Sequence, residues 1–502
     1  MFRSILSKPF AAWVVAQRNA WASKPVETQN KVFQYLIKNA QQTMFGKDHD
    51  FEHIHTYQDF QERVPVRDYE ELKPYIEWVI EGWKDVLWRD KPIYFAKTSG
   101  TTSGTKYIPI SKESIPYHIN SARDALLSYI HETGNSQFLD KKLIFLSGSP
   151  VLDTKNGILT GRLSGIVNHH VPAYLRSNQM PSYATNCIED WEEKLERIID
   201  ETLTQDMSLI SGIPPWVQMY FDRIQARTGK LISEVFPNFS VFVYGGVNFE
   251  PYRAKLFESI GKPIDSIETY PASEGFFAYQ DSQHAEGLLL LLNNGMFYEF
   301  IPADEYFKKK PRRLTIEEVE VGVNYALVLS SNAGLWAYSI GDTIKFVSKN
   351  PYRIIVSGRI KHFISAFGEH VIGEEVEKAM KYAMEKHKEV EITEFTVAPQ
   401  VTPAEGLPHH EWLIAFAKLP NDLEKFAADL DRKMCELNSY YNDLICGNIL
   451  RTLKITALPQ DAFINYMKSK GKLGGQNKVP RLANTREIAD ELVRFSLNSM
   501  EN

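Results

Sequence analysis

Short β-rich runs and longer helical segments alternate along the central part of this 502-residue chain, and this alternation restricts its fold most strongly. Strands are predicted at Ile93–Ala96, Tyr107–Ile110 and Leu143–Leu146, and helices at Ser114–His131 and Ile188–Leu203. Such alternation favours helices layered on a sheet over a β-sandwich or a helical bundle. We therefore expect an α/β fold.

The pattern changes on both sides of this central region. Residues 1–90 are predicted to be mainly helical, because apolar residues such as Val32, Leu36 and Ala40 recur at helical spacing. Between Leu314 and Val356 no helix is predicted and four β-rich runs follow one another. They are Leu314–Val321, Tyr325–Leu329, Trp336–Val347 and Tyr352–Val356. These runs predict an antiparallel sheet or a small β-barrel-like part at the end of a large N-terminal domain, residues 1–357.

The last part of the chain, residues 358–502, predicts a smaller α+β C-terminal domain. Helices are expected at Glu374–His387 and Leu423–Leu444, and strands at Val390–Val397, Trp412–Ala417 and Leu453–Leu458. A unit of this size is large enough to fold by itself.

Composition excludes several classes of protein. The chain has 57 Lys and Arg against 63 Asp and Glu, so its formal net charge is −6, which argues against a nucleic-acid partner. Three scattered cysteines form neither a disulfide framework nor a CxxC metal site, so we expect a cytoplasmic location. No apolar run approaches the length of about 18 residues that a membrane span needs, and we expect no membrane partner.

The segment Lys97–Lys106 is the strongest local signal, because every residue between its two lysines is Gly, Ser or Thr. Glycines allow close approach of the backbone to an anion, and hydroxyl and N–H groups then donate to phosphate oxygens. The spacing is not that of a Walker loop. A flexible Ser/Gly turn is the alternative interpretation. Ser103–Lys106 also fits the S-x-x-K pattern of penicillin-recognising serine hydrolases, although no K-T-G strand follows it.

Four further motifs follow this loop in order, and together with it they resemble adenylate-forming enzymes. They are Tyr270–Glu274, Tyr338–Asp342, Gly358–Lys361 with Gly368 and Glu374, and Gly474–Lys478. Within that superfamily the chain most resembles the auxin-responsive Gretchen Hagen family of acyl-acid amido synthetases. The late Q-x-K-x-P-R signature of that family is present as Gln476–Arg481.

The resemblance implies an enzyme that uses ATP and Mg²⁺ to activate a small carboxylic acid and then joins the acid to an amine, in particular an amino acid. The implied phosphate-binding residues are Thr98, Ser99, Gly100, Thr101, Thr102, Ser103 and Gly104. Gly245, Gly246, Val247 and Tyr270 are expected around the adenine, with Ser273 nearby. Glu274 is the expected Mg²⁺ ligand, Asp342 the ribose ligand, and Arg359 a ribose or phosphate ligand.

Three residues outside the nucleotide site complete the expectation. The resemblance implies that Lys478 is the catalytic lysine and that Lys361 is the hinge about which a mobile C-terminal domain moves. Arg123 is a candidate for binding the acyl substrate. Lys106 either contacts phosphate or only lies on the following strand. Two alternative functions remain open: an acyl-CoA synthetase, which forms a thioester, and a non-catalytic nucleotide-binding protein of the same fold.

Overall fold

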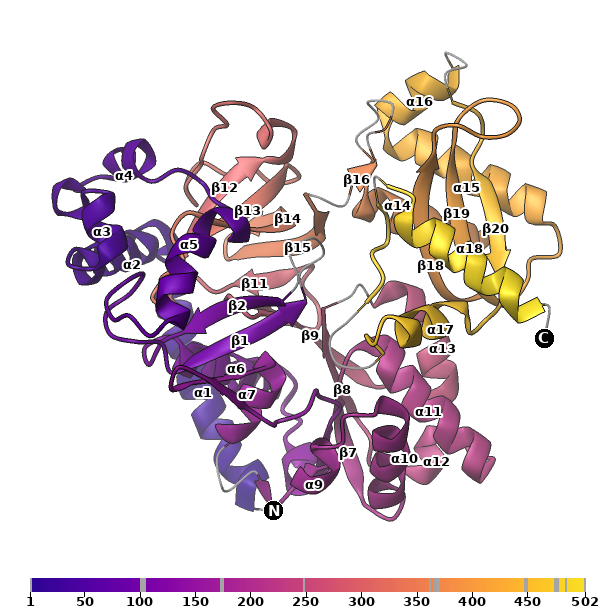
Figure 1. Cartoon of the computed structure of the whole chain (residues 1–502). Coiled ribbons are helices and arrows are strands. Elements are labelled where there is room, and N and C mark those ends of the chain that lie inside the picture. Colours follow the sequence, from indigo (N-terminus) through magenta and orange to yellow (C-terminus); the bar gives the residue numbers. More distant parts are fainter. Residues whose placement is uncertain are drawn as a thin grey trace. The chain divides into compact units, whose positions relative to one another are not determined.

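The computed structural model describes residues 2–99, 105–171, 176–246, 249–360, 363–364, 366, 371–446, 450–473, 478–483 and 485–500. Contacts group the chain into two compact units, whose elements are labelled in Figure 1. Unit 1 consists of Met1–Val247 and Phe257–Val356, and unit 2 of Asn248–Leu256 and Ser357–Asn502. The sequence alone places residues 248–256 in the N-terminal domain, whereas their contacts assign them to unit 2.

The N-terminal part of unit 1 is helical, as predicted. Its helices are α1 (Phe2–Ala22), α2 (Pro25–Ala40), α3 (Met44–Asp48), α4 (Tyr57–Arg63) and α5 (Tyr69–Ile80). Capping boxes fix the N-termini of two of these helices. At α4 the side chains of Thr56 and Asp59 each accept a hydrogen bond from the other residue's backbone N–H, and at α5 Asp68 and Glu71 do the same. Within the described ranges, no helix is both long enough and apolar enough to cross a membrane.

The main sheet of unit 1 has 11 strands among the described residues, in the order β12-β13-β14-β15-β11-β10-β9-β8-β7-β3-β6. Their bounds are β3 (Lys142–Phe145), β6 (Gln179–Met180), β7 (Met207–Ser211), β8 (Val241–Gly245), β9 (Asp265–Ala272), β10 (Gly275–Tyr279), β11 (Leu288–Leu290), β12 (Met296–Pro302), β13 (Asn324–Ser331), β14 (Tyr338–Lys349) and β15 (Tyr352–Arg359). Strands β6, β3, β7, β8 and β9 pair in parallel, whereas β10 pairs antiparallel with β9. The expectation of an α/β fold is confirmed.

The β-rich part expected at the end of the large domain contains β13 to β15, and with β12 these strands continue the main sheet. The prediction of a strand at Leu314–Val321 is wrong. Only its ends form single bridges, Leu314 with Phe300 and Val321 with Phe346. Between them Ile316 and Val319 are buried, so apolar residues in a turn with one buried side produced the β-like pattern.

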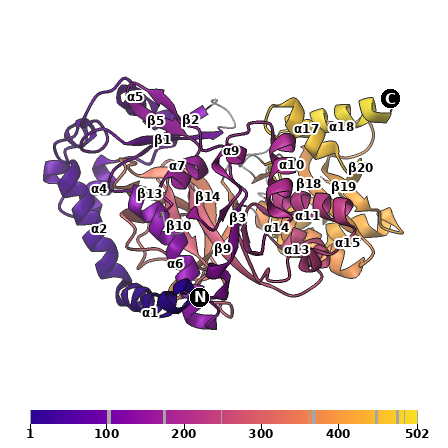
Figure 2. The same ribbon diagram turned by 90° about the horizontal axis from the view of Figure 1, so that it is seen from below.

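Helices cover the parallel part of this sheet. Val14 of α1 and Ala125 of α6 (Ile115–Thr133) pack against Leu209, Val241 and Ile267 of three adjacent strands. Figure 2 shows α1 and α6 side by side. The other α-helices that the structure describes wholly within unit 1 are α7 (Leu163–His169), α9 (Tyr183–Asn186), α10 (Trp191–Thr202), α11 (Pro214–Thr228) and α12 (Ile232–Val235).

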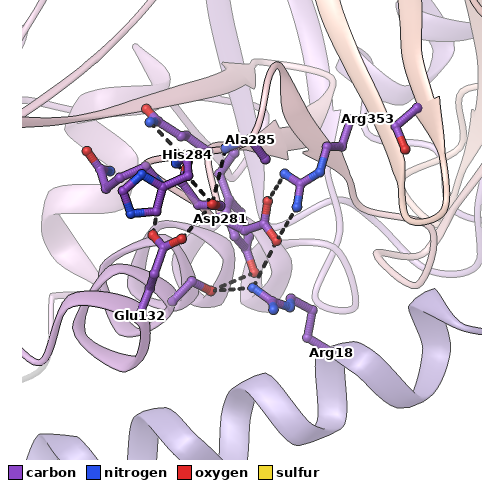
Figure 3. Close-up of polar contacts among 12 residues, drawn as sticks. Arg18, Glu132, Asp281, His284, Ala285 and Arg353 are labelled. Carbon is purple, nitrogen blue, oxygen red and sulfur yellow. Dashed lines mark hydrogen bonds and ion pairs between the residues drawn. The ribbon is translucent and has the colours of Figure 1, made fainter.

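A buried ion cluster joins α1 to the sheet (Figure 3). The carboxylate of Asp281, whose side chain is 4% exposed, pairs with Arg353 of β15 and with Arg18 of α1, the latter at 3.2 Å. Next to it, Glu132 of α6 accepts hydrogen bonds from the Ser282 hydroxyl at 2.5 Å and the Gln283 N–H at 2.7 Å. The segment after β10 therefore holds two helices against the sheet.

A second sheet of unit 1 has the order β2-β1-β5-β4. Its strands are β1 (Tyr94–Ser99), β2 (Thr105–Ile110), β4 (Asp153–Lys155) and β5 (Ile158–Gly161). Strands β1 and β2 are antiparallel neighbours from Tyr94↔Ile110 to Ser99↔Thr105, so they form the two arms on either side of the Gly/Ser/Thr-rich segment.

Unit 2 contains a three-stranded sheet with helices on both faces. The strands are β18 (Glu391–Gln400), β19 (His409–Lys418) and β20 (Lys454–Leu458), and the helices α14 (Gly373–Lys386), α15 (Leu423–Leu437), α16 (Ser439–Cys446), α17 (Ala462–Ser469) and α18 (Glu487–Met500). Trp412 and Ile414 face the core formed with α14 and α15, and Leu413 and Ala415 face α17 and α18. This alternation is the two-residue period of a strand that is buried on both faces.

Three further elements lie wholly or partly in the described residues of unit 2. Strands β16 (Phe363–Ile364) and β17 (Val371–Ile372) pair antiparallel, and helix α13 (Glu250–Ile260) begins in the segment 248–256.

The prediction of one helix over Leu423–Leu444 is wrong, because α15 ends before Asn438 and α16 begins after it. The backbone of Asn438 is extended (φ −128°, ψ 109°), and the Asn438 side chain accepts a hydrogen bond from the Tyr441 N–H. Asparagine forms such local bonds readily, and they compete with helix continuation.

The ion cluster yields a stability prediction. Replacing Asp281 by the isosteric Asn leaves the buried guanidinium groups of Arg18 and Arg353 without a carboxylate, and we expect the free energy of unfolding to fall by about 3–5 kcal/mol. Urea denaturation measures the change. The matched control is Glu27→Gln, because Glu27 pairs with Lys31 at the surface and its replacement is expected to leave the unfolding midpoint unchanged. Equal midpoints for the two variants contradict this role of Asp281.

Candidate functional site

The carboxyl end of β8 meets β9 at a backbone contact that only glycine permits. Gly245 pairs in parallel with Thr269, and a Cβ atom on Gly245 would lie 2.4 Å from the Thr269 carbonyl oxygen. The Thr269 hydroxyl donates to the Tyr244 carbonyl at 2.9 Å. Gly246 follows with φ = +80°, in the left-handed region that favours glycine. Ligands of parallel α/β sheets bind at this edge, so residues 244–246 form a suitable flat surface for a ring.

The next motif is a tight hairpin between β9 and β10. Ala272 pairs with Gly275, so Ser273 and Glu274 form the two-residue connection, and both are half-buried. Tyr270 precedes the turn on β9; it is 8% exposed and its ring lies 5.0 Å from that of Phe277. The hairpin places a carboxylate at the same sheet edge as Gly245.

Asp342 lies on a bulge of β14. Ala326 pairs with Thr343 and Val328 with Ser339, so one residue of β13 stands opposite three residues of β14. Gly341, in the middle of these three, has φ = +81°. Bulges of this kind bend a strand and redirect a side chain, and here they account for the direction of the Asp342 carboxylate.

The side chains of the two motifs meet. The Tyr270 hydroxyl donates to Asp342 Oδ2 at 2.6 Å. Strands β9 and β14 are separated by β10, β11 and β15 in the sheet order, so a flat sheet would hold them roughly 19 Å apart at the usual strand spacing. The contact therefore requires the antiparallel half of the sheet to curl towards β9, which gives this half its barrel-like character.

The segment before α5 connects β14 with the hairpin that flanks the Gly/Ser/Thr-rich segment. The Arg67 N–H donates to the Ala337 carbonyl at 3.0 Å, and the Ser339 N–H donates to the Arg67 carbonyl at 2.8 Å. Two residues later, the Tyr69 hydroxyl accepts from the Tyr107 N–H of β2 at 2.9 Å, and burial raises the pKa of Tyr69. Strand β2 is thus fixed relative to the strand that carries Asp342.

The phosphate-loop residues themselves are only partly described. Thr98 is half-buried on β1 and pairs with Lys106, and Ser99 pairs with Thr105. Gly100, Thr101, Thr102, Ser103 and Gly104 lie outside the described residues, as does Val247. Lys106 lies on β2, and its ammonium nitrogen is 5.4 Å from the centre of the Tyr69 ring.

The remaining predicted residues are distributed over both units. Arg123 of α6 pairs with Asp124 at 2.7 Å, and its guanidinium lies 5.4 Å from the ring centre of Phe10 of α1. In unit 2, Arg359 is the last residue of β15, and Lys478 is the first residue of the described range 478–483. Both side chains are exposed. Lys361, Gly368 and the residues 474–477 lie outside the described residues.

One buried cation at the same sheet edge was not found from the sequence. Lys194 of α10 is 2% exposed, and its ammonium group donates to the carbonyls of Ser147, just after β3, and Asn186, at the end of α9, at 2.9 and 2.8 Å. Burial lowers the pKa of Lys194 to about 8. The helical pattern of residues 188–203 places Lys194 next to Leu195 and Ile198, and only this position within the apolar stripe signals its burial.

The described part of the site offers two carboxylates, those of Glu274 and Asp342, and an open backbone edge at Gly245. Among the described residues, no cluster of three or more His, Cys, Asp or Glu could hold a metal ion. The Glu274 carboxylate is a group of the type that Mg²⁺ takes, usually one or two together with substrate phosphates. Asp342 offers a carboxylate acceptor to hydroxyl groups, and the edge at Gly245 offers backbone.

Family models and curated relatives agree on one assignment. The GH3 family N-terminal domain matches residues 16–184 and 161–264, the GH3 family central domain residues 289–359, and the GH3 family C-terminal domain residues 374–487. The indole-3-acetic acid-amido synthetase GH3.3 of Arabidopsis thaliana is 22% identical over 92% of this chain and 90% of its own length. The jasmonoyl–L-amino acid synthetase JAR4 of Nicotiana attenuata is 24% identical, over 57% of this chain and 60% of its own length.

Solved structures show the same fold. The GH3.15 acyl acid amido synthetase in complex with 2,4-DB has a TM-score of 0.78, with 16% identity and 96% of each chain covered. A 2-hydroxyisobutyryl-CoA ligase has a TM-score of 0.62, with 13% identity over 96% of this chain and 93% of that chain. At such low identity these likenesses establish the fold.

The contact at Gly245 yields a second prediction. In Gly245→Ala the new methyl group collides with the backbone of Thr269, and overpacking of this kind costs about 1–3 kcal/mol of folding free energy. Gly373→Ala is the matched control, because the nearest atom to its new Cβ lies 3.8 Å away. Thermal unfolding should show a lower midpoint for Gly245→Ala than for the wild type. The midpoint of Gly373→Ala should not change. A normal midpoint for Gly245→Ala means that β8 and β9 can separate at this point without cost.

Proposed function

Because the chain belongs to the GH3 family, we propose that it is an acyl-acid amido synthetase, which uses ATP to activate a carboxylic acid and then transfers the acyl group to an amine, an amino acid in particular. The observation that carries the proposal is the hydrogen bond between Tyr270 and Asp342. It joins two motifs that are distant in sequence and expected to bind one nucleotide. The names of the relatives support the amide product.

The first half-reaction forms an acyl-adenylate. A carboxylate oxygen of the acid attacks the α-phosphorus of ATP, the bond from this phosphorus to the bridging oxygen breaks, and pyrophosphate leaves. Phosphoryl-group chemistry depends mainly on positioning and on stabilisation of charge. The chain supplies donors for the phosphates from the segment Thr98–Gly104, which begins at the end of β1.

The nucleoside is proposed to bind at the sheet edge. Asp342 accepts hydrogen bonds from the ribose hydroxyls, and the Tyr270 hydroxyl holds one of its oxygens in place. The adenine lies against the backbone of Gly245 and Gly246, where the absence of side chains leaves room for a ring. Arg359 contributes positive charge to the ribose or α-phosphate.

Mg²⁺ is proposed as a cofactor, with Glu274 as its protein ligand. The carboxylate of Glu274 is the expected oxygen ligand, and the ATP phosphates supply others. When bound, the ion neutralises part of the phosphate charge and makes pyrophosphate a better leaving group. The hairpin of β9 and β10 holds Glu274 at the edge that also carries Tyr270.

In the second half-reaction the amine nitrogen attacks the acyl carbonyl and loses a proton, and AMP leaves with the electron pair of the broken bond.

We propose that residues 1–357 bind ATP and the acid and that residues 358–502 provide Lys478 for the first half-reaction. A cytoplasmic location also belongs to the proposal, supported by the three cysteines, all of which are free.

The test of the function is exchange of labelled pyrophosphate into ATP, screened over carboxylic acids. Exchange that depends on an acid supports adenylation, and binding of ATP without exchange with any acid contradicts it in favour of a nucleotide-binding protein. Each active acid is then incubated with amino acids or with coenzyme A. Formation of an amide supports the proposed product, and exclusive formation of a thioester contradicts it.

Removing the charge of Asp342 should weaken nucleotide binding. In Asp342→Asn the ribose hydroxyls lose a charged acceptor; such bonds contribute about 1.5–3 kcal/mol, so we expect the Kd for ATP to rise at least tenfold. Tyr270→Phe removes the hydroxyl that orients this carboxylate and should have a smaller effect of the same sign. Titration calorimetry measures both. Tyr279→Phe, a buried tyrosine of β10, is the control; unchanged affinity in Asp342→Asn removes Asp342 from the site.

Lys478→Ala should separate the half-reactions. An ammonium group that stabilises charge between the attacking carboxylate and the α-phosphate increases kcat by a factor of about 10²–10³. We expect such a loss in pyrophosphate exchange and little change in the conversion of supplied acyl-adenylate to amide. Lys418→Ala, which removes another exposed lysine of unit 2, is the control. Equal losses in both half-reactions contradict a role confined to adenylation.

A further inference from the structure

Arg481 is a buried arginine in the same signature as Lys478, and the proposed function gives it no role. Its side chain is 14% exposed. The guanidinium pairs with Glu394 of β18 and, at 3.4 Å, with Glu377 of α14, and it donates to the Phe395 carbonyl at 3.1 Å. It also lies 4.5 Å from the centre of the Phe395 ring. All these partners belong to unit 2.

A tyrosine from a distant part of the sequence completes the cluster. Tyr252 lies in the segment 248–256, which belongs to unit 2, and its hydroxyl accepts from Arg481 at 2.7 Å and donates to Glu394 at 3.0 Å. Burial lowers the pKa of Arg481, but the carboxylates of Glu394 and Glu377 outweigh this effect and the pKa is raised. The guanidinium therefore stays charged at every accessible pH, and its planar fork makes several bonds at fixed angles that a lysine cannot reproduce.

The backbone on both sides of Arg481 is held as firmly as its side chain. The Val397 N–H donates to the Arg481 carbonyl at 2.9 Å, and the Ala483 N–H donates to the Val397 carbonyl at 3.0 Å. These bonds add residues 481–483 to the edge of β18. The Thr396 hydroxyl also donates to the Pro480 carbonyl at 2.7 Å.

Lys478 lies three residues before Arg481, and its side chain is exposed. Val479, between them, is 8% exposed and packs into the core shared with α17 and α18. A long flexible ammonium side chain loses positional freedom only if its backbone is fixed. The anchored stretch 479–483 is the support closest in sequence, and the fork of Arg481 is its most highly bonded part.

We propose that Arg481 is a positioning residue for Lys478: its buried bonds to Glu394, Tyr252 and the β18 backbone fix the chain from which Lys478 reaches the reacting groups. The proposal rests on the proposed function, because it assigns Arg481 to the adenylation half-reaction. The guanidinium bonds of Arg481 go to Glu377, Glu394, Tyr252 and the Phe395 carbonyl, so we expect its replacement to lower kcat and to leave the KM for ATP unchanged.

The test is a double-mutant cycle with Arg481→Lys and Lys478→Ala. Arg481→Lys keeps the charge and loses the fork, and we expect a 10- to 100-fold lower kcat for pyrophosphate exchange. The KM for ATP and the conversion of supplied acyl-adenylate should change less than threefold. In the Lys478→Ala background the same substitution should have no further effect, because the group that it positions is gone.

Arg486→Lys is the matched control. Arg486 lies five positions further along the chain, is 21% exposed, pairs with Glu411 at 2.7 Å and Asp490 at 3.1 Å, and donates to the Pro399 carbonyl. It should leave pyrophosphate exchange unchanged. Tyr252→Phe, which removes only the hydroxyl bonds, is a milder variant and should lower kcat less than Arg481→Lys. Thermal midpoints verify that each variant is folded.

Three results would overturn the proposal. They are full exchange activity in folded Arg481→Lys, additive losses in the double variant, and an equal loss in Arg486→Lys. If Arg481→Lys does not fold, Tyr252→Phe decides the question by the same cycle with Lys478→Ala. Failure of the proposed function is distinct from these outcomes, because the wild-type protein would then show no acid-dependent exchange at all.

Discussion

The double pairing of strand β9 is the constraint on which the candidate site depends. On one side β9 pairs in parallel with β8, and on the other it pairs antiparallel with β10. The first pairing sets Gly245 against Thr269 at a distance that excludes any side chain. The second turns the chain at Glu274 within two residues. A parallel edge suited to a ring and a carboxylate-bearing hairpin therefore share one strand.

The curl of the antiparallel half adds the third component. Strand β14 is four positions from β9 in the sheet, yet the bulge at Gly341 and the curl of the intervening strands bring the Asp342 carboxylate to the Tyr270 hydroxyl. The segment that contains Arg67 and Tyr69 supports this arrangement. The Arg67 backbone is hydrogen-bonded to residues at the start of β14, and the Tyr69 hydroxyl accepts a hydrogen bond from β2. Buried charge plays a similar part further away, where Asp281 joins Arg18 to Arg353 (Figure 3).

Much of the local structure could be predicted, and the errors have physical causes. Helix α6 and strands β1, β2 and β3 follow from apolar periodicity, which reflects burial on one face. The break at Asn438 was missed because a single side-chain bond ended a helix whose apolar pattern continues. Leu314–Val321 was misread because buried residues in a turn imitate a strand. The burial of Lys194 depends on two carbonyls that are remote in sequence.

The sequence by itself determined which residues are expected to carry the chemistry, because glycines, hydroxyls, carboxylates and lysines at fixed spacing keep their chemical properties in any fold. It therefore sufficed for the resemblance to a family and for the roles expected of Glu274, Asp342 and Lys478. Only the tertiary structure decided which side chains from these motifs contact one another and which residues surround them. The partner of Tyr270, the anchoring of Arg481 by Tyr252 and Glu394, and the assignment of residues 248–256 to unit 2 all depend on contacts between segments far apart in the chain. Such contacts are fixed by strand order, curl and packing, which local periodicity does not encode.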